Sequence, residues 1–330
     1  MRMSLLGIFI GLLALTYGGL WWYGRSIHPI QYGISFSSQH AAWLLSDWKS
    51  MYREMMSELK PKFVRLSADW DEVEKTEGVY DFTPVDFMMD EARKHGANVL
   101  LTVGQKTPRW PECHTPGWVV EKTDSEYVKS LYAYVEAVVE RYKDHPSLEY
   151  WQVENEPYIM FNFGACPKFQ SGAIEKEFEI VRSHDTKHQI LVTDSGELSV
   201  WYPAAKKADL FGTTMYRIVT TAKNRMLTYD WLPMGWYRAR AKMLGLTSDR
   251  FFVSELQAEP WIGSGNVTST PVEDQFKTMS VDRMKKNLEE AKHTGASRAY
   301  LWGVEWWYWM KHEKGDSSFV DLAKEYLRTP

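Results

Sequence analysis

The 330-residue chain is predicted to fold as a (β/α)8 TIM barrel preceded by one N-terminal transmembrane or signal-anchor helix. Eight short apolar runs alternate with amphipathic stretches, no linker divides them, and a charge-free segment precedes them. Eight strand-helix units in about 300 residues match this barrel. A doubly wound sheet is the alternative, but GISFSSQH after the first run has a single glycine and lacks the phosphate-binding turn expected there.

Residues 1–25 differ in kind from the rest. No charged residue occurs between Arg2 and Arg25, a length of about 20 residues that crosses about 30 Å of hydrocarbon as a helix. Its end is aromatic, as in an interfacial belt, with Tyr17, Trp21, Trp22 and Tyr23. A cleaved secretory signal is the alternative, although GGLWWYGRS offers a poor cleavage site. We expect a membrane anchor over 1–25 and an extracytoplasmic domain over 26–330, secreted if the segment is cleaved.

The eight apolar runs are rich in β-branched and aromatic residues and are flanked by Gly, Pro or Asp. Separated by helical patterns, such runs indicate parallel strands with crossover helices. The runs cover residues 31–37, 62–68, 98–104, 148–154, 189–195, 209–216, 250–256 and 298–304.

The helices between the runs have recognisable starts and stops. Thr83 can cap a helix whose first position suits Pro84 and whose end is Gly96. The same start pattern recurs at Thr270 and Pro271. Between residues 124 and 142, apolar residues recur at intervals of three and four positions, which predicts a helix packed on a sheet. Shorter helical patterns cover 43–59, 172–184, 199–208, 234–245 and 318–328.

The composition argues against a nucleic-acid partner and is compatible with a carbohydrate ligand. The chain is 44% hydrophobic and 25% charged, with a net charge of −4 and no basic block, which argues against nucleic acid. Its 16 Trp, 18 Tyr and 14 Phe make up 15% of the residues. A large core uses some of them, but flat aromatic faces also line grooves that bind sugar rings. We expect a carbohydrate-binding monomer.

The two cysteines, Cys113 and Cys166, lie on neighbouring loops of the predicted barrel. They have no Cys/His spacing typical of metal sites and could pair in an oxidising compartment. Of the nine histidines only His40 and His114 fall in the upper loops, without a metal-ligand spacing. The sequence therefore predicts neither a metal nor another cofactor.

In such a barrel the active site forms at the carboxyl ends of the strands. Two glutamates there, Glu156 after the fourth strand and Glu255 at the seventh, can serve as acid and nucleophile if their surroundings push their pKa values apart. Glu154 is expected to support the site, and Glu197 to be a loop acid. The other candidates for substrate contact are Arg65, Gln105, Trp110, Asn155, Tyr216, Trp261, Trp302 and Glu305.

Asn155-Glu156-Pro157 after strand four and Glu255 in FFVSELQAEPW resemble glycoside hydrolase clan A, the retaining β-glycosidases built on a (β/α)8 barrel. The resemblance covers about residues 31–310 and is cellulase- or mannanase-like, but LQAEPW after Glu255 leaves the family within the clan open. It implies that Glu156 is the acid/base, that Asn155 holds the sugar 2-hydroxyl and that Glu255 is the nucleophile. By the same match Arg65 and Tyr216 orient the nucleophile, and Trp302 is the floor of the sugar site.

The sequence thus predicts a retaining glycosidase that cleaves a β-linked poly- or oligosaccharide without a cofactor. Its short insertions would leave an open groove, which favours cleavage within a polysaccharide. Two alternatives stay open. One is a transglycosidase that remodels a surface glycan, and the other is a non-catalytic carbohydrate-binding barrel.

Overall fold

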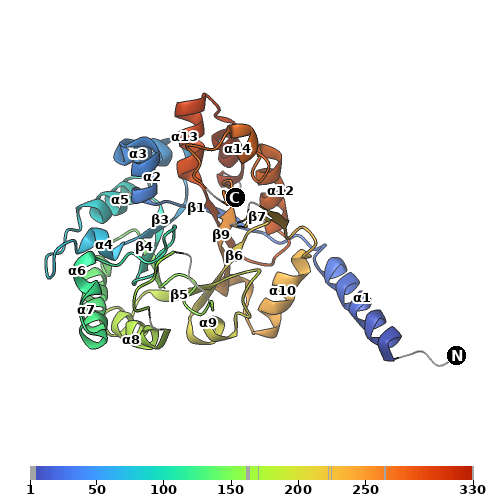
Figure 1. The fold of residues 1–330 in the computed structure, drawn as a ribbon, viewed down its shortest axis with the longest axis horizontal. Coiled ribbons are helices and arrows are strands. Elements are labelled where there is room, and N and C mark those ends of the chain that lie inside the picture. Colours follow the sequence, from blue (N-terminus) through green and yellow to red (C-terminus); the bar gives the residue numbers. More distant parts are fainter. Residues whose placement is uncertain are drawn as a thin grey trace.

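The structure, a computed structural model, describes residues 5–160, 164–169, 171–221, 223, 225–263 and 265–328. Eight parallel strands close into a barrel in the order β1-β10-β9-β6-β5-β4-β3-β2, and helices surround it (Figure 1). The predicted barrel is therefore confirmed, with one strand for each apolar run. The strands are β1 Gln31–Ser35, β2 Phe63–Ser67, β3 Asn98–Val103, β4 Leu148–Val153, β5 Gln189–Asp194, β6 Leu210–Met215, β9 Phe251–Gln257 and β10 Arg298–Trp302.

Most predicted helices are present, and the best defined is the one from 124 to 142, where Thr123 and Glu126 form a capping box. The described helices are α1 Leu5–Tyr23, α2 Ser38–Leu45, α3 Trp48–Leu59, α4 Trp70–Val73, α5 Thr83–Lys94, α6 Gly117–Val120, α7 Asp124–Tyr142, α8 Ile174–His184, α9 Tyr202–Lys207, α10 Met234–Met243, α11 Val272–Gln275, α12 Val281–Ala291, α13 Val304–Lys314 and α14 Ser318–Leu327, with 3-10 turns at Ser171–Ala173 and Ser248–Arg250.

Some local predictions were wrong. Phe82, not Thr83, precedes α5, and Thr83 is its first residue. The start pattern at Pro271 leads only to the single turn of α11, while the crossover helix α12 starts after Ser280, whose side chain accepts the Arg283 N–H. The sequence reading also missed α13 and a hairpin formed by β7 (Ile218–Thr220) and β8 (Met226–Thr228).

The barrel interior is packed rather than open. Its lower part is filled by an apolar cluster, over which the Arg298 guanidinium lies 3.5 Å from the ring centre of Phe63 and pairs with Glu149. The cluster consists of Phe63, Leu100, Leu191, Leu210, Phe252 and Tyr300. Above it the inward side chains of β2 and β4 are Arg65 and Gln152, joined at 2.8 Å. These polar side chains form the floor of the carboxyl-end mouth.

A β-bulge in β9 turns the chain just before the mouth. Thr213 of β6 pairs with Val253, but the next residue, Thr214, pairs with Glu255, so that Ser254 is extra. An extra residue in one strand bends it and changes the face on which the following side chains lie. The bulge therefore changes the direction of Glu255 relative to the strand below it.

Helix α1 stands outside the barrel and meets it beside α10 (Figure 1). Its window Leu6–Tyr23 has a mean hydropathy of 1.4, and none of it is buried. By length and composition this helix could cross a membrane, as the sequence predicts.

Candidate active site

The loop after β4 carries Glu154, Asn155 and Glu156 in an unusual backbone conformation. Glu154 has φ 59° and Glu156 has φ 44°, in the left-handed region that non-glycine residues rarely adopt. Backbone bonds hold the loop there. The Asn155 N–H donates to the Lys106 carbonyl at 2.7 Å, and the Glu156 N–H donates to the Thr193 hydroxyl at 2.8 Å. Such strain typically clusters at functional sites.

Glu154 lies beneath this loop and ties it to the end of β3. Its fully buried carboxylate accepts the backbone N–H groups of Gln105 at 2.8 Å and Lys106 at 2.5 Å. Gly104, with φ 130°, leaves the space, because a Cβ there would lie 2.5 Å from the Glu154 carboxyl carbon. Burial raises the pKa of Glu154 to about 7, and a hydrogen bond with Glu177 of α8 and the two backbone N–H groups oppose the rise. The contacts fit the expected supporting role.

Glu156 is set up to hold a proton. Its side chain is 4% exposed, and its Oε1 has no hydrogen-bond partner among the described residues. Burial raises the pKa of Glu156 well above its ordinary value, and the nearby carboxylates Glu112 and Glu255 raise it further. A carboxyl group kept neutral in this way can donate a proton at neutral pH.

Glu255 has the opposite surroundings. One carboxylate oxygen accepts a 2.9 Å hydrogen bond from Arg65, and the other accepts one of 2.9 Å from the Tyr216 hydroxyl. Burial raises the pKa of Tyr216 well above its ordinary range, so this hydroxyl keeps its proton to donate. The two donors fix the carboxylate at the mouth, three strands around the barrel from the strand that leads to Glu156.

Arg65 joins the two halves of the site. Its Nη2 donates to Asn155 at 2.8 Å, while Nη1 also reaches the Ser254 carbonyl in the bulge at 3.2 Å. The Asn155 amide nitrogen donates to Glu112 at 3.2 Å. One buried guanidinium thus sets the positions of residues from both β4 and β9.

Glu197, expected to be a loop acid, is half-buried and positions Tyr216. Its Oε1 accepts the Tyr216 N–H at 3.0 Å and the hydroxyl of Tyr237. Burial raises the pKa of Glu197 to about 7. The sequence does not predict these contacts of Glu197, because they depend on packing between the loop after β5 and helix α10.

Lys106 and Glu112 form a second unpredicted pair, on the loop after β3. The ammonium lies 3.0 Å from Glu112 Oε2 and donates to the Glu156 carbonyl at 3.2 Å. The Lys106 side chain is fully buried, and burial raises the pKa of Glu112. The pair places one positive and one negative charge close to the acid/base candidate.

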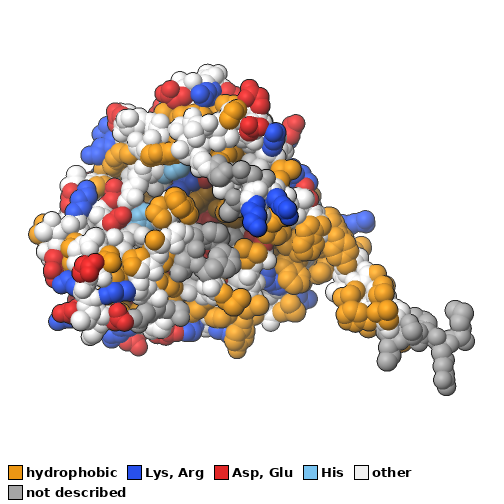
Figure 2. Space-filling model, in the orientation of Figure 1, with side chains coloured by type: hydrophobic (Ala, Val, Ile, Leu, Met, Phe, Trp, Pro, Cys, Tyr) orange, Lys and Arg blue, Asp and Glu red, His pale blue; other side chains and the backbone are white. Residues whose placement is uncertain are grey.

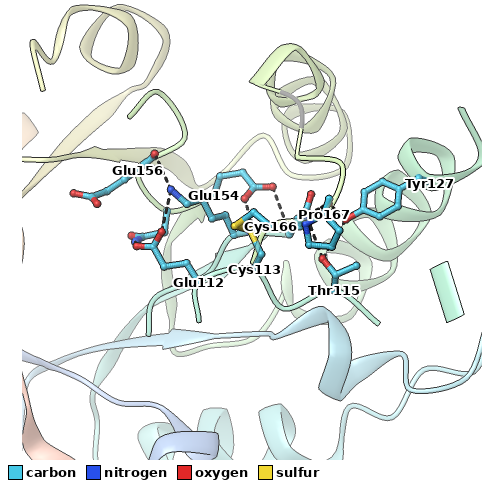
Figure 3. Close-up of a disulfide and its surroundings, with 11 residues drawn as sticks. Glu112, Cys113, Thr115, Tyr127, Glu154, Glu156, Cys166 and Pro167 are labelled. Atoms are coloured by element: carbon cyan, nitrogen blue, oxygen red, sulfur yellow. Dashed lines mark hydrogen bonds and ion pairs between the residues drawn. A yellow bond between two sulfur atoms is a disulfide. The ribbon is translucent and has the colours of Figure 1, made fainter. Parts of the chain in front are cut away.

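A disulfide between Cys113 and Cys166 joins the loops after β3 and β4, with 5.0 Å between the two Cα atoms (Figure 3). Beside it, the Gln105 amide donates to Thr115 at 3.1 Å and to the Pro167 carbonyl at 2.8 Å. The amide nitrogen of Gln105 therefore holds the two loops together, and the substrate contact of this residue stays a prediction.

Trp302 lies at the mouth as expected, but its face is covered. The Arg109 guanidinium lies 4.4 Å from its ring centre and forms ion pairs with Glu259 and Glu305. Glu305 is fully buried and accepts the Ser37 N–H at 2.6 Å. Among the described residues this side of the mouth encloses about 10 Å³, room for about one water molecule. The expected open groove is therefore closed at Trp302, although Figure 2 shows a hollow in the barrel face.

The two remaining tryptophans differ in exposure. Trp110 is 73% exposed on the loop after β3. Trp261 is half-buried and packs edge-on against Tyr216, with 5.2 Å between ring centres. Among the residues that the structure describes, no group of three His, Cys, Asp or Glu side chains could hold a metal ion.

Sequence comparison finds similarity to β-galactosidases and β-mannanases. A family model for β-galactosidases, glycoside hydrolase family 42, matches residues 39–172. β-Galactosidase BgaB of Geobacillus sp. is 29% identical over 111 residues, 26% of this chain and 16% of that protein. A probable mannan endo-1,4-β-mannosidase of Aspergillus terreus is 27% identical over 122 residues, 34% of this chain and 30% of the other. The match to the first covers about a sixth of that relative's length.

Solved structures share the fold. Xylanase 10B of Thermotoga maritima superposes with a TM-score of 0.57 at 18% identity, covering 94% of this chain and 97% of that one. The barrel, the strand-end carboxylates and the sequence matches together identify the chain as a member of glycoside hydrolase clan A.

Proposed function

We propose that the chain is a retaining β-glycosidase that acts on a β-linked poly- or oligosaccharide, with Glu156 as acid/base and Glu255 as nucleophile. The contrast between the two carboxyl groups carries the proposal. Glu156 is buried without a donor to its Oε1, whereas Glu255 receives a donor on each oxygen. A carboxyl group without donors tends to keep its proton and can act as the acid, whereas one that accepts two hydrogen bonds tends to stay ionised and can act as the nucleophile.

In the first step a Glu255 oxygen attacks the anomeric carbon and the bond to the leaving oxygen breaks. Glu156 gives its proton to that oxygen, which leaves a glycosyl ester on Glu255 and a carboxylate on Glu156. In the second step Glu156 removes a proton from water, and the resulting hydroxide displaces Glu255. Both carboxyl groups then return to their starting states, and the product keeps the β configuration.

The surrounding residues tune these steps. Arg65 and Tyr216 hold the Glu255 carboxylate in one orientation, which preserves the line of attack on the anomeric carbon. After the first step Lys106 faces a negative Glu156, and its positive charge lowers the pKa of that residue, which helps the carboxylate form. Asn155 lies between Arg65 and Glu112 with its amide fixed, where it can hold the sugar 2-hydroxyl.

Sugar entry requires Arg109 to leave the face of Trp302. A pyranose ring would then take the place of the guanidinium on the indole, an apolar surface that suits the CH face of a sugar. Arg109 carries one positive charge against the carboxylates of Glu259 and Glu305. Because this cluster has no excess positive charge, it favours a neutral sugar over an anionic one. β-Galactosides, β-mannans and β-xylans are the substrates to test first, since the similar proteins are named for them.

We also propose the division into a membrane anchor over 1–25 and an extracytoplasmic catalytic barrel over 26–330, active as a monomer without a cofactor. The apolar helix and the Cys113–Cys166 disulfide support this location, since disulfides persist in oxidising compartments.

Azide rescue tests the two assignments separately. With an activated aryl β-glycoside, Glu156→Ala should accumulate the glycosyl-enzyme, and azide should release it as a β-glycosyl azide. In Glu255→Ala azide should instead replace the nucleophile and give the α-glycosyl azide. Azide products of the opposite configuration, or unchanged turnover in Glu255→Ala, would refute the assignment. Hydrolysis and glycosyl transfer are told apart by the products formed with an added sugar acceptor.

A further inference from the structure

Helix α1 is attached to the barrel by a close contact between two glycines. A Cβ on Gly235, in the first turn of α10, would lie 2.0 Å from the Leu20 carbonyl oxygen. A Cβ on Gly24 would lie 2.5 Å from the Gly235 nitrogen. No side chain fits between these backbones. Next to them Arg238 donates to the Tyr23 carbonyl at 3.2 Å and lies 4.3 Å from the centre of its ring. These contacts fix the direction in which α1 leaves the barrel.

A second contact lies further along α1, away from the barrel. The Tyr17 hydroxyl donates to the Trp231 carbonyl at 2.6 Å. Tyr17 precedes Tyr23 by six residues, which is about 9 Å along the helix axis. The loop before α10 therefore extends beside nearly two turns of α1.

The surface around this second contact carries exposed apolar side chains, and Asp230 beside Trp231 is held in ion pairs with Arg283 and Lys286. Trp231 is 58% exposed, Met226 57% and Leu227 46%. On the last turns of α1, after Tyr17, Trp21 is 47% exposed and Trp22 is 72% exposed. Figure 2 shows hydrophobic side chains continuing from α1 onto the adjoining surface of the barrel. An exposed patch of this kind indicates an interaction surface.

We propose that residues 226–231, which we call the membrane seat, lie in the headgroup region of the bilayer that α1 crosses. This rests on the proposed anchoring of α1. The helix has 19 residues, so its length is about 28 Å, close to the 30 Å of the hydrocarbon core. Because Tyr17 lies about 9 Å below the barrel end of α1, the seat, which contacts Tyr17, must reach at least as deep as the headgroup region. Tryptophan at the level of the headgroups is typical of membrane proteins.

The seat is also connected to the catalytic mouth. It follows β7, where the Thr220 hydroxyl donates to the Trp261 carbonyl at 3.1 Å and the Trp261 indole donates to the Thr220 carbonyl at 3.0 Å. Trp261 packs against Tyr216, which holds Glu255. A barrel seated in this way has its mouth beside the membrane surface, within reach of glycans attached there.

Fluorescence quenching in vesicles tests the seat on the full chain. An environment-sensitive probe is attached to Leu227→Cys and, as a control, to Val79→Cys. Val79 is 62% exposed and belongs to the segment between α4 and α5, two helices that lie on the side away from α1 (Figure 1). In phosphatidylcholine–phosphatidylglycerol vesicles we expect the probe at 227 to be quenched by nitroxide-labelled lipid and shielded from iodide. The probe at 79 should show the reverse.

Three outcomes would overturn the seat. If the protein floats with the vesicles but iodide reaches both probes equally, the anchor stands and the seat is wrong. If the probe at 227 is shielded from both quenchers, a protein covers the patch instead. If the protein does not float with the vesicles, α1 does not anchor it, and the proposed membrane seat is wrong as well. Turnover of an aryl β-glycoside by the same samples reports on the proposed catalytic function independently of all three.

The glycine contact offers a second test. Gly235→Ala should push α1 away from α10, so that the probe at 227 loses its quenching by lipid while the protein still floats. Gly117→Ala is the matched control, because a Cβ there meets no atom within 4 Å. An unchanged quenching pattern in Gly235→Ala would contradict the proposal.

Discussion

Arg65 and Glu255 meet at 2.9 Å in the centre of the barrel mouth, and both side chains are almost completely buried. The guanidinium also reaches Asn155 and Gln152, so its planar fork fixes residues from two strands at once. A single charged group thus determines the relative position of the proposed nucleophile and the loop that carries the proposed acid.

Arg65→Lys should lower kcat by about 10²–10³-fold, because lysine cannot make the same set of fork-shaped contacts. Steady-state kinetics on an aryl β-glycoside would measure it. The control is Arg298→Lys, which changes a similar buried arginine paired with Glu149 at the other end of the barrel. Equal losses of kcat in both variants, after correction for folded fraction, would mean that Arg65 acts only through stability.

Gly104→Ala should displace Glu154 and with it the loop that carries Glu156. The new Cβ would lie 2.5 Å from the Glu154 carboxyl carbon, and φ 130° is unfavourable for alanine. We expect a loss of about 2–4 kcal/mol of unfolding free energy together with a lower kcat. Urea unfolding and initial rates would show both effects, and Gly117→Ala should show neither. A fully active and stable variant would contradict the described role of Glu154.

Glu112→Gln should move the basic limb of the pH–rate profile to lower pH. The Glu112 carboxylate raises the pKa of Glu156, whereas Lys106 lowers it. Removing the negative charge therefore lowers the pKa of the proposed acid, which loses its proton earlier as the pH rises. The profile of kcat/KM measures this shift directly. If the basic limb stays in place or moves to higher pH, Glu112 does not raise the pKa of the acid/base.

Glu177→Gln should reduce the loss of stability at rising pH. Burial raises the pKa of Glu177 well above its ordinary value and that of Glu154 to about 7, against about 4.3 in the unfolded chain. The folded state thus holds more protons, so the stability that the pair contributes is complete below about pH 4 and is lost as the pH rises through about 7. Glutamine keeps a donor for Glu154 without a proton to lose.

Urea unfolding from about pH 5 to about pH 8 measures the effect. Lys106, Tyr127 and Tyr134 also face this pair and are unchanged in the variant. Glu179→Gln, an exposed change on the same helix, should leave the slope of stability against pH as it is. Identical slopes in wild type and Glu177→Gln would show that the Glu154–Glu177 pair does not cause the loss of stability at rising pH.

The barrel could be predicted because its strands are buried on both faces and stand out as apolar runs. Helix α13 could not, since Trp306, Trp307 and Trp309 are all buried and leave little periodicity to recognise. Helix α12 was missed because a start signal at Pro271 precedes it and ends after one turn. Local sequence patterns predict local structure. Helices α12 and α13 were not predicted because tertiary packing determines where they form.

At the site, the strand count was enough to bring Arg65, Glu156 and Glu255 together. The positions of Lys106, Glu112 and Arg109 depend instead on the course of the loop after β3, which a disulfide and contacts between strands determine. The closed face of Trp302 follows from the same loop. Strand order therefore predicts which residues meet at the mouth. Loop packing determines which charged side chains surround them and which of their faces are exposed.

The role of Glu255 as nucleophile can be tested directly by a mass measurement of the trapped enzyme. The full chain is incubated with an activated 2-deoxy-2-fluoro β-glycoside of the sugar that it hydrolyses, digested with pepsin and analysed by peptide mass. We expect the fluoroglycosyl group on the peptide that contains Glu255, in wild type but not in Glu255→Gln. A label on another carboxylate, or an enzyme that is inhibited without any covalent label, would contradict Glu255 as the nucleophile of a retaining glycosidase.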